Sequence, residues 1–317
     1  MITDDKHIQL LRTSSSTRST ARRLQRLART GALTRIRPGV FAAPDRLVDL
    51  DAVEWHVLRL RAVLPRLPPG AMPSHLTAAA LYGWPHIGSW PERVHVTDQT
   101  ALTDRQRDGL TVHRALDGAI GQVTHVFDGL SVLPMAATAV ELARALPMPE
   151  SLVILDHLLR TGSVTRDAVE HRVERTREKG RGAVARVVGL ASGRRESVGE
   201  SYCAARMVEI GAPSFEEQHE FRHADGTMDR VDFWLPDLGI VVEFDGRQKY
   251  EDPTMRGGRD APDVLWDEKR REDRIRRRPE VHTFIRVRWW HLVDPDRLRA
   301  LFREHGVRLA VRPAGLA

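Results

Sequence analysis

The spacing of apolar residues changes along the chain, and each spacing predicts a different element. In STARRLQRLARTG, residues 19–31, apolar side chains recur every three or four positions, which predicts a helix. Ser19 or Thr20 is expected to cap its start, and a glycine to end it. A short apolar helix is expected around residues 7–11. The stretch LTRIRPGVFA, residues 33–42, alternates around a Pro-Gly pair and predicts a β-hairpin.

The middle of the chain mixes helical and strand spacings, which indicates an α+β region. Helices are predicted at residues 48–64, 73–83, 135–146 and 150–162, and short strands at residues 93–98, 110–115 and 124–130. Two charged helices split by Gly180-Arg181-Gly182 follow within residues 163–196. We expect them to form a linker or brace.

The stretch VDFWLPDLGIVVEFDG, residues 231–246, places acids inside two apolar, β-branched runs around a tight turn. A hairpin of simple register has the pairs Leu235–Ile240, Phe233–Val242 and Asp232–Glu243. Alternation then predicts an apolar face of Val231, Phe233, Leu235, Ile240, Val242 and Phe244, and an acidic face of Asp232, Glu243 and Asp245. Directly opposed side chains lie about 4.5–5.5 Å apart at Cβ, where two carboxylates repel. A divalent cation is the expected compensation.

Further helices and strands are expected around this hairpin. They are a helix within residues 197–213, a strand at residues 219–223, a charged helix at residues 264–279, a strand at residues 281–287 and a helix opened by Asp294-Pro295. In the first of these helices, Ser197 and Glu200 have the spacing of a capping box, in which Glu200 would bond back to the Ser197 amide. The mixture again predicts an α+β arrangement.

Composition narrows the class of protein. The length of 317 residues allows about two or three domains. The single cysteine, Cys203, excludes an internal disulfide framework and a cysteine-based zinc site. The N-terminal segment has no apolar signal core, and no stretch approaches the ~18 apolar residues of a membrane span, so a cytoplasmic location without membrane contact is expected.

The positive charge is concentrated near the N-terminus. The net charge is +6, and eight arginines but no acids lie between Asp5 and Asp45. Helix, turn, helix and wing is a DNA-docking geometry, and the elements expected in this segment have that order. Contacts to nucleic acid are expected from Arg18, Arg22, Arg23, Arg26, Arg35 and Arg37. The alternative is a solvated arginine-rich helix packed on the next domain.

Three other features have two interpretations each. Ser74 and His75 are a nucleophile and a base, but adjacent side chains rarely face each other, so Ser74 is expected to cap the helix that follows. In the charged helix, Lys269, Arg270 and other basic residues suit a phosphate backbone, whereas the interleaved acids suit a surface helix with ion pairs. Trp289 and Trp290 are expected to pack in or near the core rather than to stack on bases.

Three segments resemble the winged-helix region and following domain of the type IV antitoxins. They are ARRLQRLARTGALTRIRPGVFAAPD, PSHLTAAALYGWP and FDGLSVLPMAATAVELARAL, and the resemblance covers roughly residues 1–165. It implies a DNA-binding transcriptional repressor. Its expected parts are a winged helix-turn-helix over residues 1–45 and an antitoxin-like α+β domain over residues 46–165, followed by a helical linker over residues 166–196.

The order of elements over about residues 196–300 resembles the core of the PD-(D/E)XK nucleases. More narrowly, it is similar to an uncharacterised family related to the very-short-patch-repair endonucleases. The resemblance implies a restriction-endonuclease-like α/β core over residues 197–317. Carried over to this chain, it makes Glu200 the helix-borne acid, Asp232 the acid of the second strand and Glu243 the acid of the third.

The chain departs from the nuclease motif at Asp245, which stands where the motif has a lysine two residues after the last acid. Either the role of that lysine has moved to Lys249 or Lys269, or the site is degenerate. An ammonium group is a compact, adjustable charge that a guanidinium does not replace directly.

The nuclease resemblance implies metal-assisted phosphodiester hydrolysis. Asp232, Glu243 and Asp245 would bind Mg²⁺ or Mn²⁺. Lys249 would lie near the attacking or leaving oxygen, and Glu200 would hold a metal-bound water. The expected function is a DNA endonuclease with an N-terminal DNA-binding domain, with homodimerisation as one option for assembly. The alternative is an antitoxin-like DNA-binding regulator with a degenerate, non-catalytic nuclease fold.

Overall fold

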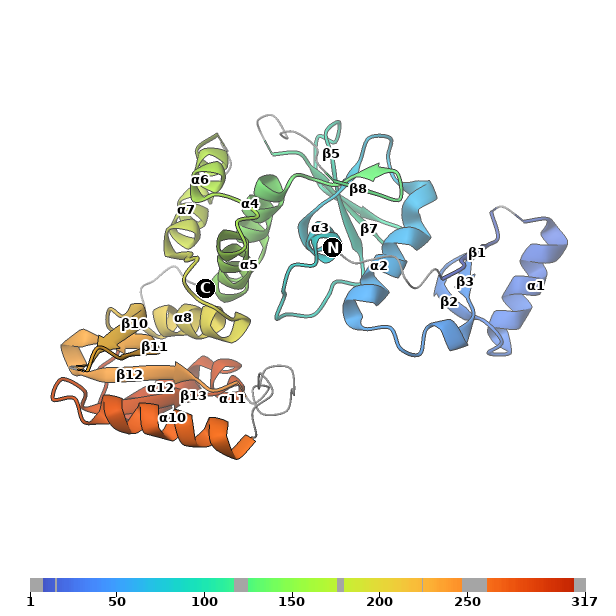
Figure 1. Ribbon diagram of the computed structural model, residues 1–317. Helices are drawn as coiled ribbons and strands as arrows, with labels where there is room; N and C mark the ends of the chain where they lie inside the picture. The colour runs from blue at the N-terminus through green and yellow to red at the C-terminus, as the bar shows by residue number, and fades with distance from the viewer. Residues whose placement is uncertain are drawn as a thin grey trace. The chain divides into compact units, whose positions relative to one another are not determined.

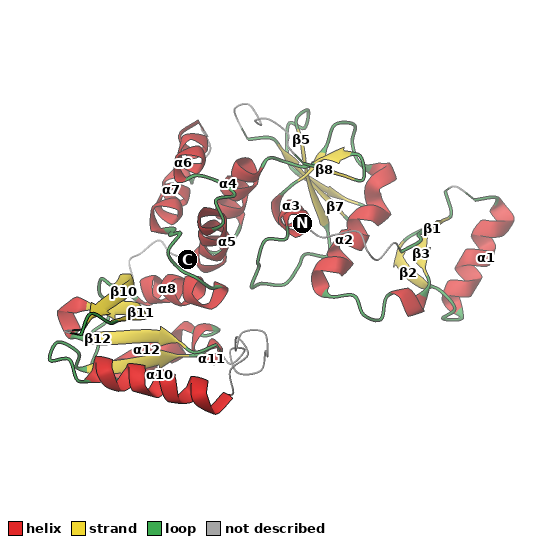
Figure 2. Cartoon of the chain, viewed as in Figure 1, coloured by secondary structure: helices red, strands yellow, loops and turns green. Residues whose placement is uncertain are grey.

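The computed structural model describes residues 8–14, 16–116, 125–175, 180–223, 225–246 and 261–310. The protein is α+β, with several separate sheets, as Figure 1 and Figure 2 show. It divides into two compact units: Met1–Leu146 with Val164–Gly189, and Pro147–Ser163 with Leu190–Ala317. This division does not follow the expected segment boundaries at residues 165 and 196, because Pro147–Ser163 groups with the C-terminal part.

The N-terminal region of the first unit combines one helix with a small sheet. The sheet has the order β1-β3-β2. Its elements are α1 (Arg18–Arg29), β1 (Leu11–Arg12), β2 (Thr34–Arg37) and β3 (Val40–Ala42). Leu24 of α1 packs with Leu33 and Phe41, so the apolar stripe predicted for this helix is its buried face. The predicted hairpin is also present, as the antiparallel pair β2–β3.

Two expectations for this region are wrong. The residue that caps α1 is Thr17, whose Oγ1 accepts the Thr20 amide at 3.3 Å, rather than Ser19 or Thr20. Residues 8–11, which belong to the expected first helix, are not helical. Leu11 instead pairs with Phe41 of β3, because strand pairing and burial outweigh the weak helix preference of so short an apolar segment. The order helix, turn, helix is therefore not found in the described part of residues 8–45.

The second part of the first unit is built on a four-stranded sheet of order β4-β5-β7-β6. Its elements are α2 (Ala52–Val63), β4 (Met72–Pro73), α3 (His75–Tyr82), β5 (Val94–Asp98), β6 (Arg105–Arg107) and β7 (Leu110–Arg114). Strands β5 and β7 run parallel. Their valines pack with apolar residues of α2 and α3, such as Leu60 and Ala78, in one core. The helices predicted at residues 48–64 and 73–83 are confirmed.

The remaining elements of the first unit surround this sheet or connect it to the chain. They are η1 (Pro44–Arg46), η2 (Leu64–Arg66), β8 (Val126–Phe127), β9 (Leu130–Ser131), α4 (Met135–Ala145), α6 (Arg166–Arg175) and α7 (Arg181–Leu190). Helix α4 contacts both α3 and α6. The pair α6 and α7 confirms the two charged helices predicted before residue 196.

The second unit is built on a four-stranded sheet of order β10-β11-β12-β13, with β12 and β13 parallel. Its elements are α5 (Met148–Arg160), α8 (Val198–Ile210), β10 (Glu216–Arg222), β11 (Met228–Leu235), η3 (Pro236–Leu238), β12 (Ile240–Phe244), α10 (Ala261–Arg276), β13 (Thr283–Val287), α11 (Trp289–Leu292) and α12 (Pro295–Glu304). Helices α8 and α10 lie on opposite sides of the sheet (Figure 1). Helix α5 packs against α8.

A buried arginine attaches α5 to the rest of the second unit. Arg195 Nη1 donates to Asp156 of α5 at 2.6 Å, and Arg195 Nε donates to Glu217 of β10 at 2.9 Å. Burial raises the pKa of Asp156, and the nearby Arg195 opposes that shift. A buried ion pair is costly to break on one side only, so this link explains why α5 belongs to the second unit.

The acid-bearing hairpin has the predicted register but not the predicted faces. Phe233 pairs with Val242 and Leu235 with Ile240, as expected. However, Val231 packs with Trp234 and with Ile275 of α10, so alternation does not hold from Val231 to Leu235. A local irregularity accounts for the change of side.

The irregularity lies where β10, β11 and β12 meet. On β10, Gln218 has a left-handed backbone with φ of 51°, a conformation that disrupts a regular strand. On β12, the Phe244 amide donates to the Asp232 carboxylate at 2.8 Å. The side chain of Asp232 therefore takes a backbone donor instead of simply facing Glu243.

Candidate functional site

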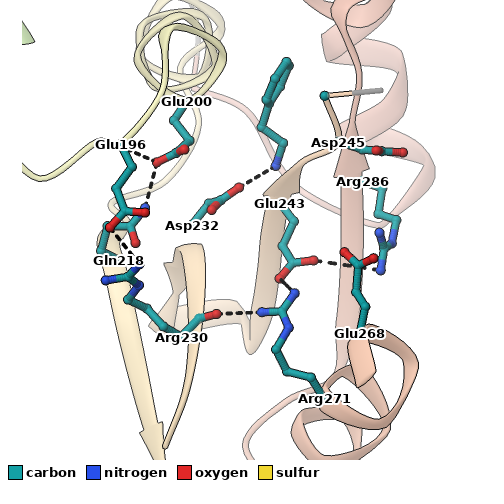
Figure 3. Close-up of a pocket in the computed structure, with 12 residues that line it drawn as sticks. Glu196, Glu200, Gln218, Arg230, Asp232, Glu243, Asp245, Glu268, Arg271 and Arg286 are labelled. Atoms are coloured by element: carbon teal, nitrogen blue, oxygen red, sulfur yellow. Dashed lines mark hydrogen bonds and ion pairs between the residues drawn. The ribbon is translucent and has the colours of Figure 1, made fainter. Parts of the chain in front are cut away.

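A polar pocket of about 270 Å³ lies at this irregular part of the second unit's sheet (Figure 3). Its charged lining residues are Glu196, Glu200, Arg230, Asp232, Glu243, Asp245, Glu268, Arg271 and Arg286. The pocket thus brings together Glu200, Asp232, Glu243 and Asp245 from α8, β11, β12 and the end of β12. It contains six carboxylates and three guanidinium groups, which gives it an excess of negative charge.

Glu200 is held by donors from two elements. Its Oε2 accepts the Glu196 amide at 2.8 Å and Gln218 Nε2 at 2.7 Å, and its Oε1 accepts the Ser197 hydroxyl at 2.8 Å. Ser197 does cap α8 by accepting the Glu200 amide at 3.1 Å. The expected return bond to the Ser197 amide is replaced by the bond to the Glu196 amide. Glu200 therefore both stabilises the helix start and faces the pocket.

Glu243 is paired with arginines rather than repelled by acids. Arg271 of α10 donates to Glu243 Oε1 at 2.7 Å, and Arg286 of β13 lies 3.9 Å from Oε2. Arg271 also donates to the Arg230 carbonyl at 2.6 Å, which fixes the guanidinium across the pocket. The expected repulsion between Asp232 and Glu243 is therefore relieved here by cationic side chains and a backbone amide.

Arg286 connects this cluster to a further acid. It donates to Glu272 of α10 at 2.5 Å. Burial alone would raise the pKa of Glu272, but hydrogen bonds from Arg286 and Arg276 lower it below its usual value. Glu272 is thus kept ionised and holds Arg286 in place beside Glu243.

Asp245 lies at the edge of the pocket. Its carboxylate pairs with Arg288 Nε at 3.1 Å. The carboxylates of Asp232, Glu243 and Asp245 do not form a tight group: among the described residues, the trio with ligand atoms within 4.8 Å of one another consists of histidines. Asp245, like Glu243, is held by an arginine.

Of the two candidate lysines, the structure describes only Lys269. Lys249 lies outside the described residues. Lys269 is exposed on α10, with its ammonium 5.6 Å from the centroid of the Trp266 ring. It does not line the pocket among the described side chains. Its exposed neighbour Arg270 also faces away from that lining.

The sequence did not indicate a site role for Gln218. Arg271 was expected among the basic residues of the charged helix that suit a phosphate backbone, and the run that begins at Arg286 was expected to flank the site. Arg271 and Arg286 carry a weak signal, because each lies on an element predicted to flank the acids and provides the opposite charge. Gln218 carries no such signal, because its position depends on its own left-handed backbone in the middle of β10. Trp289, 38% exposed, packs against Tyr202 and Phe244, which agrees with the expected edge packing, whereas Trp290 is 54% exposed.

The N-terminal arginines divide into two groups. Arg18, Arg22, Arg23, Arg26 and Arg35 are exposed. Arg37 is half-buried and donates to the Asp108 carbonyl at 3.1 Å, and burial with the nearby Arg66 lowers its pKa. Arg37 therefore connects β2 to the second sheet of the first unit, whereas the other five are presented to solvent.

Comparison with known proteins gives relatives but no assigned activity. The chain is 32% identical over 239 residues to the uncharacterised proteins MT2308 and Rv2248 of two Mycobacterium tuberculosis strains. The match covers 74% of this chain and 82% of each relative. The chain belongs to their family. No family model and no solved structure matches the sequence.

Within the described ranges, no helix combines the length and apolar character needed to cross a bilayer. Because the two relatives are uncharacterised, the geometry of the pocket is the basis for a function.

Proposed function

We propose that the second unit is a metal-dependent nucleic-acid phosphodiester hydrolase that acts on DNA. The observation that supports this most is the convergence of Glu200, Asp232 and Glu243, from three separate elements, on one pocket. Acids buried this far in a sheet weaken it unless they serve a site or are fully paired. Here Glu200 accepts a hydrogen bond from Gln218, Glu243 pairs with Arg271, and all three acids line one cavity.

The donor chemistry of the pocket suits a hard divalent cation. Asp232 and Glu243 offer carboxylate oxygens, the ligands that Mg²⁺ and Mn²⁺ prefer. The excess of carboxylates would repel a phosphodiester unless a cation were bound between them. A bound Mg²⁺ would supply a nucleophilic water of lowered pKa and would neutralise charge that develops on the phosphoryl oxygens.

The residues of the chain would position the substrate around that ion. Asp232 and Glu243 would hold the cation, and Glu200 would orient groups at the α8 side of the pocket. Arg271 and Arg230 line the same cavity and offer guanidinium groups that match the geometry of phosphate oxygens. The exposed arginines of α1 would add sequence-independent contacts to the DNA backbone.

A second function is favoured by the pairing of Glu243 with Arg271 and of Asp245 with Arg288. If these ion pairs persist when DNA is present, the fold would act as a non-catalytic scaffold in an antitoxin-like DNA-binding regulator. The absence of the motif lysine at position 245 agrees with that alternative.

Plasmid cleavage distinguishes the two functions. The full chain would be incubated with supercoiled plasmid in Mg²⁺, Mn²⁺ or EDTA, beside Glu243→Gln and the matched control Glu220→Gln, which alters an exposed acid of β10. Hydrolysis that needs the ion and Glu243 but not Glu220 supports the nuclease. DNA binding without cleavage in either ion supports the regulator.

A further inference from the structure

A second pocket, of about 230 Å³, lies in the first unit and is not used by the proposed hydrolase. Its polar lining consists of His75, Asp104, His113, Arg114, Glu141 and Arg144. Two of these histidines, with His95 beside them, offer one ring nitrogen each within 4.8 Å of the other two. Three imidazole nitrogens at this spacing can bind one metal ion.

Strand register and a helix start bring the three rings together. In the parallel pair β5–β7, His95 is opposite Thr111 and Thr97 is opposite His113, so both histidines are on the same face of the sheet. His113 Nε2 and His95 Nδ1 are 3.0 Å apart. His75, the first residue of α3, stacks on His113 with the ring centroids 3.9 Å apart.

The backbone at His75 is held in an uncommon conformation. Its φ of 50° is in the left-handed region, which residues other than glycine rarely adopt. Ser74 makes no side-chain cap to α3, contrary to expectation, and its Oγ lies 3.1 Å from His75 Nδ1. The start of α3 is therefore shaped to place the ring of His75 and not to cap the helix in the usual way.

Two carboxylates face the outer nitrogens of these rings. Asp104 Oδ2 is 3.2 Å from His113 Nδ1, and Glu141 Oε2 is 3.2 Å from His75 Nδ1. A carboxylate that accepts Nδ1–H fixes the ring tautomer and leaves the Nε2 lone pair free for a metal. The Asp104–His113 pair therefore has the form of a histidine ligand with its supporting acid, and Glu141 lies at the same distance from His75.

Glu141 gives independent support for an absent ligand. It is 5% exposed on α4, and its Oε1 accepts the Thr97 hydroxyl at 3.2 Å. Its Oε2 is buried without a well-formed hydrogen bond. A buried carboxylate oxygen without a hydrogen bond lowers the stability of the folded protein. A cation on the histidines would place a positive charge near this oxygen.

We propose that His75, His95 and His113 bind one divalent transition-metal ion of the zinc class, with a further coordination position open toward the 230 Å³ pocket. Three nitrogen ligands select Zn²⁺, Co²⁺ or Ni²⁺ over Mg²⁺. A site with three protein ligands and an open position holds water or a small anion in the fourth place. This site is separate from the proposed hydrolase site and does not depend on it.

The test uses the full chain, stripped with a chelator and titrated with Zn²⁺ and with Co²⁺. Calorimetry is expected to show one high-affinity Zn²⁺ per chain, and Co²⁺ is expected to give the intense visible absorption of a four-coordinate site. X-ray absorption at the zinc edge of the wild type is expected to show three imidazole ligands. That measurement needs no variant to fold.

Variants assign the ion to these residues. His113→Ala is expected to weaken Zn²⁺ binding by more than 100-fold, whereas Asp104→Asn, which alters the supporting acid, is expected to weaken it by about 10- to 100-fold. The controls are His171→Ala, an exposed histidine of α6, and Glu243→Gln in the second unit. Both controls are expected to leave the affinity unchanged.

Three results would overturn the proposal. One is the absence of one-to-one Zn²⁺ binding by the wild type at micromolar concentrations. The second is a zinc-edge spectrum dominated by oxygen ligands, and the third is binding that survives both His113→Ala and His95→Ala. Loss of plasmid cleavage in Glu243→Gln has no bearing on any of them, so the two proposals fail separately.

Discussion

The acid pocket of the second unit and the histidine pocket of the first unit both gather ionisable groups, but the charge of those groups is compensated differently in each. Both place several ionisable groups where water is partly excluded. In the acid pocket arginines such as Arg271 pair with the carboxylates. In the histidine pocket burial removes the charge, because rings such as His95 have a lowered pKa. Charge pairing suits a hard oxygen-bound ion, and neutral lone pairs suit a softer one.

The largest expected effect is on catalysis in the acid pocket. Glu243→Gln removes a candidate metal ligand, so we expect plasmid cleavage to fall by about 100- to 1,000-fold, as when a group that stabilises transition-state charge is lost. Single-turnover cleavage in Mg²⁺ measures it. An unchanged rate, with Glu220→Gln as control, would show that the acid pocket is not the active site.

The same variant also has a stability prediction, and the structure reverses the one that the sequence suggests. Opposed acids predict that Glu243→Gln leaves the metal-free protein as stable or more stable. Arg271 pairs with Glu243, so the substitution instead leaves a half-buried guanidinium without its partner. We expect a loss of about 1–2 kcal/mol in the metal-free free energy of unfolding, measured by urea titration in EDTA.

The histidine side of the comparison predicts acid sensitivity in the first unit. His56 is fully buried, bonds Thr77 and the Pro91 carbonyl, and has a pKa lowered by burial to about 4. The unfolded chain takes up a proton near pH 6.5, and the folded chain does so only near pH 4. The contribution of neutral His56 to the free energy of unfolding is therefore complete above pH 6.5 and is lost as the pH falls toward 4.

That loss is expected to be about 2–3 kcal/mol, from roughly two units of pKa difference. Urea unfolding at closely spaced pH values between 4 and 7 measures it. His56→Gln keeps a hydrogen-bonding side chain without the titration, and the pH dependence should flatten in this variant. A curve equally steep in both proteins would contradict the assignment to His56.

DNA binding by the first unit gives a smaller effect. The triple substitution of Arg22, Arg23 and Arg26 by Gln removes exposed charge from α1 without touching its buried Leu24. Each lost phosphate contact should lower the log–log salt slope by about one unit. Filter binding at several salt concentrations measures the slope. Arg181→Gln with Arg186→Gln on α7 is the control, and an equal change there would argue against a role specific to α1.

The smallest expected effect sharpens the choice between nuclease and regulator. Arg271→Gln leaves Glu243 free of its closest cation, so Mg²⁺ affinity should rise several-fold because a competing positive charge is gone. Mg²⁺-dependent thermal stabilisation of the wild type and the variant measures this change. If Mg²⁺ stabilises neither protein, the ion pair is structural and the regulator is favoured.

The sequence predicted much of the fold because most elements follow local rules. The stripe of α1, the β2–β3 hairpin and the pairing of Phe233 with Val242 depend on spacing and turns within a few residues. The convergence of Glu200, Asp232 and Glu243 was reached through a family resemblance, and the pocket agrees with it.

What could not be predicted depends on contacts between distant residues or on unusual backbone. The pairing of Leu11 with Phe41 overrode a local helix pattern. Gln218 has a left-handed backbone within β10, and Val231 packs with Trp234 and Ile275 against the expected alternation. The three histidines are far apart in sequence and on three elements, so no spacing indicates their meeting. Only the register of β5 against β7 and the strained start of α3 reveal it.

The assignment of α5 to the second unit has a consequence for how the chain is made and divided. The chain enters the second unit at Pro147, returns to the first unit at Val164 and enters the second unit again at Leu190. Neither unit is therefore one continuous piece of the gene. During synthesis, α5 emerges before α8, its packing partner, and must wait for it. A fragment that starts at Ser197 lacks both α5 and Arg195, so a fragment that keeps the whole second unit has to start at Pro147 and also carries α6 and α7 of the first unit.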